Sequence, residues 1–495
     1  MRPLRHRDAR GARAAWRVAL ALALQACATQ DPIQLAPTTP LKPWPIPPTP
    51  MPAAQAPPRA LAEPVAPQPE VDRLYDLPAL IDLAQRINPQ TRDAWERARQ
   101  AALAVGLVES TYLPQISAEA LAGYQRTPLP IPSSLIPEGH FTATTREILP
   151  TIAVKWLLFD FGRRDGAQKA ARENSFVANV AFTGEHQKLI YAVTRDYYAL
   201  GAARGKRHAA QTALKTSTLD GEAVDAKREH GLATVVDVAK AQRQVAQAQF
   251  NLARAQGAEQ KAYAALLASV GVAPTAKLRI SDESEQPLPA PPAATLDEYV
   301  TQALENRPDI LAGIGKVRAA QAALEKERAE HRPTIAMLAQ GYQNIGAIST
   351  NGGPYYSVNK PGGAVFFQFS WPLFDGGRRD RQVAIAQSEV EVASGHLERA
   401  RTEATKEVVD AYSALTTALA AHAAATELTK AARVAHAAGL DAYRQGVGTY
   451  TALLDDENVL VQAQTELEDA RASVLTAAAA LAFVTGAIGS SGQLR

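Results

Sequence analysis

The chain has 495 residues, 46% of them hydrophobic, so it is long enough for several folded segments and too apolar to be disordered throughout. Its 52 Lys and Arg residues nearly balance 50 Asp and Glu residues, which excludes the basic footprint of a nucleic-acid-binding protein. Aromatic residues make up only 6%, which suits closely packed helices better than a broad aromatic core. We therefore expect a mainly α-helical protein.

Residues 1–26 have the pattern of a secretory signal peptide. Six arginines precede a short apolar run over Val18–Ala23, which is too short to span a bilayer as a stable helix. Cys27 follows as the only cysteine, so no intramolecular disulfide is possible. Its position is similar to the lipidation site of bacterial lipoproteins, where acyl chains such as palmitate are attached. Alternatively, cleavage at the small residues around Cys27 discards it with the signal.

Residues 27–70 are rich in proline. Proline lacks a backbone N–H and interrupts helices, and the segment has few apolar residues that could be buried. We expect an extended tether that does not pack on the folded part of the chain.

A helix and a β-hairpin are predicted at the start of a first structural repeat over residues 71–273. The helix follows Pro89 and ends at Pro114, because proline cannot continue the helical hydrogen-bond ladder. The hairpin covers residues 115–160, and its first strand alternates apolar with polar residues. A Pro- and Gly-rich loop over 127–150 leads to a second strand, in which Lys155 opposes an apolar set: Ile152, Val154, Trp156 and Leu158.

Long helices are predicted over the rest of this repeat, residues 163–272. No proline occurs between Gly162 and Ala273, so one helix could run from Arg163 to about Arg228, roughly 65 residues or about 100 Å at 1.5 Å per residue. A helix of this length does not fit inside a compact globule. It must lie against similar helices along its length.

A Pro-rich linker over residues 274–295 precedes a second repeat over residues 296–489. This repeat has the same order: a helix, a β-hairpin over 334–375 with a loop over 345–363, and long helices over 377–485. In its second strand the aromatic residues alternate with polar Gln368 and Ser370. A short tail of residues 490–495 ends the chain.

The two repeats match residue by residue. Trp156 recurs as Trp371, 215 residues later, and the same offset holds for many positions after it. Before Trp156 the offset is 219, because Pro114 corresponds to Pro333. The first repeat therefore carries four extra residues within its hairpin, and such an insertion marks a loop.

The strands match the pattern of transmembrane β-barrels, with about ten residues, one apolar face, one polar face and aromatic residues near their ends. A small amphipathic sheet packed on a helix would show the same alternation, so alternation alone leaves both structures open. Four strands cannot close a membrane barrel, and open sheet edges are not tolerated in lipid. Cyclic assembly of three chains would supply twelve strands, with the long helices continuing the cylinder.

With these features the sequence resembles the TolC-like family of outer-membrane efflux proteins over about residues 74–485. The specific marks are the Asn-Pro and Asn-Arg-Pro helix starts, the duplicated Leu-Phe-Asp turns from strand to helix, and the segment from Tyr443 to Thr449. The resemblance implies a homotrimer with a twelve-stranded β-barrel and a long periplasmic α-helical barrel of coiled-coil type. It also implies an equatorial belt that includes the Pro-rich linker.

The resemblance further implies an exit duct in the outer membrane, anchored by lipid as well as spanning it. In a tripartite efflux system, such a duct passively conducts small molecules delivered by an inner-membrane transporter through a periplasmic adaptor (membrane fusion) protein. With a Cys at the start of the mature chain, the protein is similar to the branch of the family that serves resistance-nodulation-division transporters. Two alternatives stay open: the exit duct of a type I protein secretion system, and a periplasmic coiled-coil adaptor or scaffold. The second is disfavoured because adaptors have one helical hairpin and this chain has two.

Two turns between long helices are predicted at the periplasmic tip. Their glycines suit a left-handed helix terminus, and the threonines after them can cap the next helix. In the family, these tips meet the helical hairpin of the adaptor. The candidates for adaptor contact are Arg228, Gly231, Thr234, Arg444, Gly446, Gly448 and Thr449.

Acidic residues follow each turn and are candidates for a periplasmic gate: Asp237 after the first turn, and Asp455, Asp456 and Glu457 after the second. In a threefold pore each inward carboxylate forms a ring of three, which favours cation binding or raised pKa values. Leu454 stands where one type of family member has a gating Asp, so the ring is expected at Asp455 or Asp456. The same acids fit ordinary helix starts that complement the helix dipole.

No catalytic constellation is apparent. The nine His residues lack metal-ligand spacing, and no Gly-rich loop lies between a strand and a helix. We interpret the segment Gly376–Arg379 as a strand exit with basic side chains near the membrane rim. The chain is therefore expected to have no enzymatic activity, no cofactor and no metal.

Overall fold

The computed structural model describes residues 36–37, 39, 41–42, 44, 70, 73–132, 134, 139–281 and 287–488. The predicted signal peptide, Cys27 and the tail lie outside these residues. The chain forms two compact units. The sheet unit contains Gln100–Ser175 and Lys316–Ala393, and the helical unit contains Ala36–Arg99, Phe176–Gly315 and the chain from Ser394 onward.

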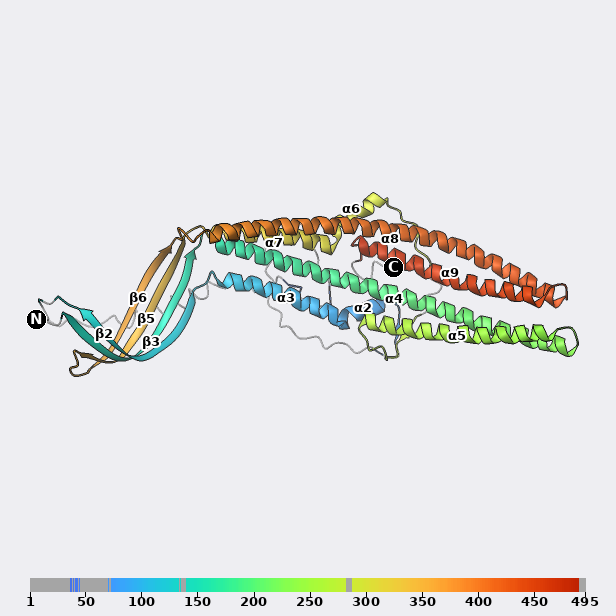
Figure 1. Ribbon diagram of the computed structural model, residues 1–495, viewed down its shortest axis with the longest axis horizontal. Coiled ribbons are helices and arrows are strands. Elements are labelled where there is room, and N and C mark those ends of the chain that lie inside the picture. Colours follow the sequence, from blue (N-terminus) through green and yellow to red (C-terminus); the bar gives the residue numbers. More distant parts are fainter. Residues whose placement is uncertain are drawn as a thin grey trace, which may run out of the picture. The chain divides into compact units, whose positions relative to one another are not determined.

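The sheet unit is built on one four-stranded antiparallel sheet (Figure 1). Its strands lie in the order β2 (Gln115–Pro130), β3 (His140–Phe159), β5 (Thr334–Thr350) and β6 (Tyr356–Ser370). They have 15 to 20 residues, so the expected length of about ten was too short. The predicted loops over 127–150 and 345–363 were too long for the same reason.

Prolines within the strands explain this error. Pro128 and Pro130 lie in β2 and Pro361 lies in β6, and both are edge strands, where a missing N–H is tolerated. Pro150 lies in the inner strand β3, where the pairing with β5 skips it while the pairing with β2 continues. A proline therefore does not end a strand here.

The hairpin connections confirm the predicted position of the insertion. Residues 131–139 connect β2 to β3, whereas residues 351–355 connect β5 to β6, a difference of four residues. β2 corresponds to β5 at the offset of 219, and β3 corresponds to β6 at the offset of 215. The offset of the repeat therefore changes at this connection.

One face of the sheet is apolar across all four strands. Directly paired residues share a face, and successive pairs join Ile116 to Val154, Val154 to Ala339, and Ala339 to Val365. Ile116 is 58% exposed and Val365 is 62% exposed. The alternation predicted for the strands is confirmed, and it leaves large apolar side chains uncovered in a single chain.

The predicted alternation is wrong at the end of β3. A β-bulge between Leu157 and Phe159 shifts the register, so that Phe159 rather than Leu158 lies opposite Ile335. A bulge adds one residue to one strand and cannot be recognised from alternation alone.

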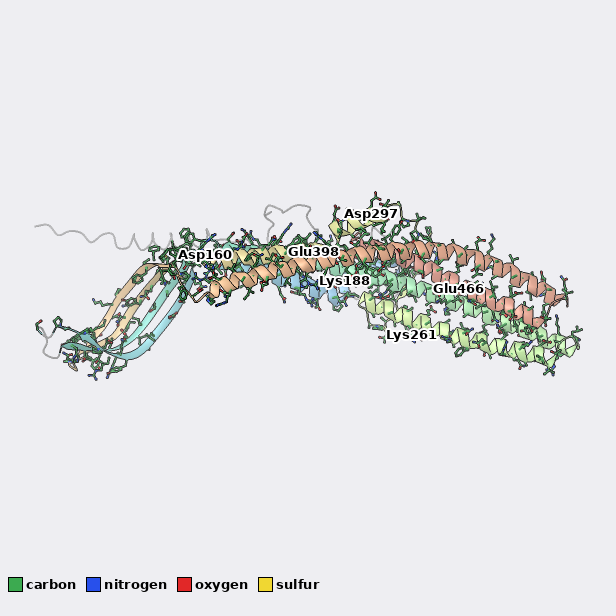
Figure 2. The ribbon with its side chains drawn as sticks, turned by 45° about the horizontal axis from the view of Figure 1, so that its top comes forward. Asp160, Lys188, Lys261, Asp297, Glu398 and Glu466 are labelled. Atoms are coloured by element: carbon green, nitrogen blue, oxygen red, sulfur yellow. The ribbon has the colours of Figure 1, made fainter. Side chains whose placement is uncertain are left out.

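An aspartate and an arginine four residues later join each strand to the following helix. Asp160 lies where the strands meet the helices (Figure 2). The Nε atom of Arg164 lies 3.0 Å from Asp160 Oδ2, and in the second repeat Arg379 Nε lies 2.7 Å from Asp375 Oδ2. Both arginines are buried. They hold together three chain segments, because each also donates to a carbonyl oxygen of the preceding helix end, that of Thr111 or Glu330.

The two arginines of the second strand exit, Arg378 and Arg379, have different surroundings. The Arg379 guanidinium is occupied by Asp375 and by backbone, and only Arg378 of this pair is exposed. A sequence of two adjacent arginines does not distinguish the buried from the exposed one.

Two pairs of long helices follow the β-hairpins in the sequence (Figure 1). The first pair is α4 (Arg163–Glu229) and α5 (Val235–Val270), and the second is α8 (Arg378–Arg444) and α9 (Tyr450–Val484). α4 and α8 have 67 residues each, which confirms the predicted unbroken helix of about 65. Within the described residues, no helix combines the length and the apolar character needed to cross a lipid bilayer.

Shorter helices precede each β-hairpin: α2 (Leu77–Ile87), α3 (Pro89–Ser110), α6 (Leu296–Asn306) and α7 (Pro308–Ala329). The starts of α3 and α7 at proline were predicted, but α2 and α6 were missed. α6 begins with a capping box in which Thr295 Oγ1 accepts from Glu298 N while the Glu298 carboxylate accepts from Thr295 N. This pattern of Thr and Glu three residues apart was readable in the sequence.

The main apolar core of the helical unit lies between α2, α4 and α5. Leu80, Ile190 and Leu266 are at most 1% exposed. β1 (Leu74–Tyr75) pairs in parallel with β4 (Arg279–Ile280) of the Pro-rich linker, and Ile280 is buried in the same core. Part of the linker is thus a structural element that is fastened to the first repeat.

The described residues of the tether around Pro37 and Trp44 pack on the helical unit, contrary to expectation. The Trp44 ring meets Phe176 edge to face at 6.0 Å, and the Trp44 carbonyl accepts a hydrogen bond of 2.9 Å from Thr183 Oγ1. The indole N–H of Trp95 donates to the carbonyl of Pro37 at 2.9 Å. The large apolar ring of Trp44 supplies the contact surface here that proline and the short polar residues beside it lack.

Candidate functional site

The first tip joins α4 to α5 through a left-handed glycine. Gly231 has φ +74°, and the N–H groups of Gly231 and Leu232 donate to the carbonyls of Arg228 and Lys227, the pattern of a Schellman helix end. Thr234 then caps α5, and its Oγ1 accepts from the N–H of Asp237. The predicted left-handed helix end at Gly231 and the predicted helix cap by Thr234 are confirmed.

The second tip joins α8 to α9 in the same way. Gly446 has φ +79°, and Thr449 caps α9 by accepting from the N–H of Ala452. Gly448 approaches α8 closely, since a Cβ atom there would lie 3.1 Å from atoms of Ala442 and Tyr443. Larger residues at position 448 would push the turn away from the helix.

Contacts between the two tips, which the sequence did not reveal, join the helical hairpins. Lys227 Nζ of α4 donates to the carbonyl of Tyr443 at 3.0 Å and lies 3.8 Å from the centroid of the Tyr443 ring. Lys240 Nζ of α5 donates to Thr451 Oγ1 of α9 at 2.7 Å. A third bond of 3.1 Å joins Gln244 to Asn458. We call these three contacts the tip latch.

An apolar cluster lies beneath the tip latch. Val224 of α4, Val238 of α5, and Tyr450, Leu453 and Leu454 of α9 are each at most 6% exposed. Leu454 is thus part of the contact between the hairpins. An acid at this position would be buried among apolar side chains.

The four predicted gate acids have different surroundings. The Asp237 carboxylate accepts from the backbone N–H and the hydroxyl of Thr234, at 3.0 and 2.7 Å, and these bonds lower its pKa. Asp455 is exposed. Asp456 is half-buried, with its carboxylate packed against Gly439 of α8. Glu457 is 2% exposed and does not share the surface of the other three.

Glu457 belongs to a buried polar cluster that the sequence did not predict. Neither of its carboxylate oxygens has a hydrogen-bond partner within the described residues, and the same holds for Asp220 Oδ2, His436 Nε2 and the Tyr450 hydroxyl. Burial and the nearby Asp220 raise the pKa of Glu457 to about 7. Burial also raises the pKa of Asp220, and the nearby His436 and Arg444 partly oppose this rise. The cluster joins α4, α8 and α9 next to the tip latch.

Both tips present apolar side chains to solvent. Leu232 is 75% exposed and Val447 is 80% exposed, and each follows the left-handed glycine of its turn. Arg228 and Arg444, the predicted contact residues, are exposed at the ends of α4 and α8. Exposed apolar residues with an arginine nearby are typical of a surface that binds another protein.

A groove lined mainly by alanine and short polar side chains runs between the two helical hairpins. Its volume is about 920 Å³, and α4, α5, α8 and α9 all contribute to its lining. Among the residues that the structure describes, no group of three or more His, Cys, Asp or Glu could hold a metal ion. The two tips and the groove thus offer surfaces on which another protein can dock, and the buried cluster around Glu457 offers titratable groups.

Comparisons with known proteins agree with this fold. A family model described as "Outer membrane efflux protein" matches residues 80–272 and 299–487. Protein CyaE of Bordetella pertussis is 29% identical over 430 residues, 86% of this chain and 87% of that protein. Outer membrane protein OprJ of Pseudomonas aeruginosa is 23% identical over 387 residues, 77% of each chain. The solved structure of outer membrane protein VceC of Vibrio cholerae has a TM-score of 0.67 and 21% identity, with 84% of this chain and 96% of that chain covered. This last likeness shows a shared fold.

Proposed function

Because the chain belongs to the outer membrane efflux protein family, we propose that it is the outer-membrane exit duct of a tripartite efflux system. Three copies would form a twelve-stranded barrel in the outer membrane and a helical tunnel in the periplasm. The duct is passive, catalyses no reaction and needs no cofactor. An inner-membrane transporter, of resistance-nodulation-division type, supplies the energy, and Cys27 carries a lipid anchor.

One observation carries this proposal. The sheet has an apolar face that is exposed in one chain, and it ends in two edge strands, β2 and β6, that have a neighbour on one side only. In lipid, unpaired backbone groups cost several kcal/mol each, so a four-stranded sheet must be completed by other strands. Copies of the same chain supply strands of matching length and matching apolar face.

The periplasmic adaptor is proposed to meet the two tips. Leu232 and Val447 offer apolar contact, Arg228 and Arg444 offer charge, and the alanine-lined groove between the hairpins can accept a further helix. The equatorial belt is proposed around the Pro-rich linker, which β4 fastens to β1.

A cellular assay separates this function from its main alternative. Cells that lack the chain are expected to accumulate several-fold more of a fluorescent efflux dye than cells complemented with it, because the pump has lost its exit. Export of proteins by a type I system should be unchanged. Normal dye accumulation together with loss of a secreted protein would instead establish the protein-secretion duct.

We propose Asp455 and Asp456 as the acidic ring of the gate, because Asp237 is engaged in a cap and Glu457 is buried. Divalent cations are expected to block single-channel current through the wild-type duct from the periplasmic side. Asp455→Ala should weaken this block about tenfold, since three carboxylates leave the entrance together. Exposed Glu222 of α4 provides the control. Divalent cations should block the Glu222→Ala channel as strongly as they block the wild-type channel. Block that is equal in all three proteins would refute the ring.

A further inference from the structure

The charged residues of the first β-hairpin are sorted between the two faces of the sheet. Arg126 of β2 and Arg146 of β3 lie on the apolar face, because each is an even number of residues from Val154 or from the residue paired with it. The carboxylates of the same two strands, Glu119 and Glu147, lie on the opposite, polar face. The apolar face of this hairpin therefore carries two arginines and no acid.

The two arginines lie where the apolar band of the sheet ends. On β3 the band runs from Trp156, near the junction with α4, to Ile148, and Arg146 is the next residue on the same face. The ten residues from Trp156 to Arg146 extend about 33 Å along a strand. At the strand tilt of membrane barrels, about 35–45°, this length gives a height of about 25 Å, the height of their apolar band. In the proposed barrel both arginines thus lie at the surface of the outer leaflet, where a charge facing lipid is tolerated.

The guanidinium of Arg146 lies against two aromatic rings. Its Cζ atom is 4.5 Å from the centroid of the Tyr355 ring and 6.0 Å from that of Tyr124, the residue paired with Arg146 on β2. Contacts of this kind use the flat face of the guanidinium, whereas its N–H groups point outward in the plane. Within the described residues, these N–H groups have neither a hydrogen bond nor an ion pair. The side chain is thus held in place with its donors available.

Arg126 lies next to Arg146 on the same face. Tyr124 pairs with Arg146 and Arg126 pairs with Thr144, so the two arginines are diagonal neighbours with their Cα atoms about 7–8 Å apart. Arg126 is exposed and, in the part of the chain that the structure describes, it also lacks a hydrogen bond or an ion pair. Two guanidinium groups at this separation can bind one phosphate, whose oxygens match the planar donor fork of arginine.

We propose that Arg126 and Arg146 bind a phosphate group of lipopolysaccharide, the phosphorylated glycolipid of the outer leaflet. The inference rests on the proposed function, because the barrel must span the outer membrane. The phosphate belongs to a lipid because an apolar surface adjoins the arginines, including Ile148, which is 53% exposed, and its paired residue Ala122. Acyl chains that extend from the bound headgroup can lie along this surface, whereas a free phosphate ion would make no contact with it.

Native mass spectrometry of the purified full-length trimer in detergent tests the site, with bisphosphorylated lipid A as the probe. Wild-type trimers are expected to retain lipid A, with one molecule for each chain. The double variant Arg126→Gln, Arg146→Gln should bind lipid A about tenfold more weakly or worse, because the charged donors of both side chains are lost.

Lys360 provides the matched control. It is an exposed cation of β6 on the polar face, paired with Asn344, whose side chain bonds Glu147. Lys360→Gln should retain lipid A as the wild type does, provided that each variant is compared as a trimer that conducts ions. An equal loss of binding in Lys360→Gln and in the double variant would overturn the proposal, and so would equal affinity of the double variant and the wild type.

The same measurement separates a lipid phosphate from a free anion. Lipid A without its two phosphates should bind about tenfold more weakly than the bisphosphorylated form, whereas an excess of inorganic phosphate should leave bound lipid A in place. Displacement by inorganic phosphate would assign the site to a free anion and overturn the lipid proposal. A wild-type protein that forms neither a trimer nor a channel would instead refute the proposed function.

Discussion

Replacing Lys227 and Lys240 together by alanine is expected to open the tip and to raise single-channel conductance several-fold. The double variant removes two hydrogen bonds and a cation–π contact of the tip latch. Each bond contributes about 1 kcal/mol and the ring contact about 0.5–1 kcal/mol, so one chain loses about 2–3 kcal/mol. Three chains lose about 6–9 kcal/mol, and about 5.5 kcal/mol suffices to move a two-state equilibrium from 1:99 to 99:1.

Lys261 provides the matched control for the tip latch. It is an exposed lysine of α5, labelled in Figure 2, and within the described residues it makes no hydrogen bond or ion pair with α8 or α9. Lys261→Ala should conduct as the wild type does. If the Lys227→Ala, Lys240→Ala protein and the Lys261→Ala protein had equal conductance, the latch contacts would not hold the tip closed.

The tip is expected to loosen as pH rises from about 5 to 8, and Glu457→Gln is expected to abolish this change. The pKa of Glu457 is raised to about 7 from an ordinary value of 4.5, so the folded tip binds a proton that the unfolded chain has lost. Its stabilising effect is complete below about pH 4.5 and is lost as pH rises through 7. Above pH 7 a charged, unpartnered carboxylate is left beside Asp220. The loss is on the order of 1–3 kcal/mol.

Hydrogen exchange of the segment around residues 445–460 measures this change. After correction for the intrinsic rates, protection in the wild type should fall about 10- to 100-fold between pH 5 and pH 8. The Glu457→Gln protein should show a flat profile, and Asp455→Asn, which changes an exposed acid two residues away, should follow the wild type. A wild-type profile that is flat, or that rises with pH, would contradict the buried cluster.

Sequence reasoning succeeded where structure depends on local pattern. The absence of proline predicted an unbroken helix of about 65 residues in the first repeat and long helices in the second, and the structure has a helix of 67 residues in each. Gly231, Thr234, Gly446 and Thr449 predicted both turns, because a left-handed glycine and a capping threonine act within a few residues. The repeat predicted two equivalent β-hairpins. Strand length was underestimated because edge strands tolerate proline.

The contacts that distinguish this tip depend on residues far apart in the chain. Lys227 and Tyr443 are separated by 216 positions, and nothing in either local sequence marks them as partners. The same is true of Asp220, His436 and Glu457, whose burial results from the packing of three helices. Glu457 and Asp455 follow the same turn, but helical periodicity places Glu457 on the buried face of α9 and Asp455 on the exposed face.

The most direct test of the central claim is the conductance of the purified protein in planar lipid bilayers, combined with its migration on gels before and after heating. The protein from outer-membrane fractions is expected to be a heat-modifiable trimer that forms ion-conducting channels. A soluble monomer that leaves the bilayer current unchanged would contradict this expectation.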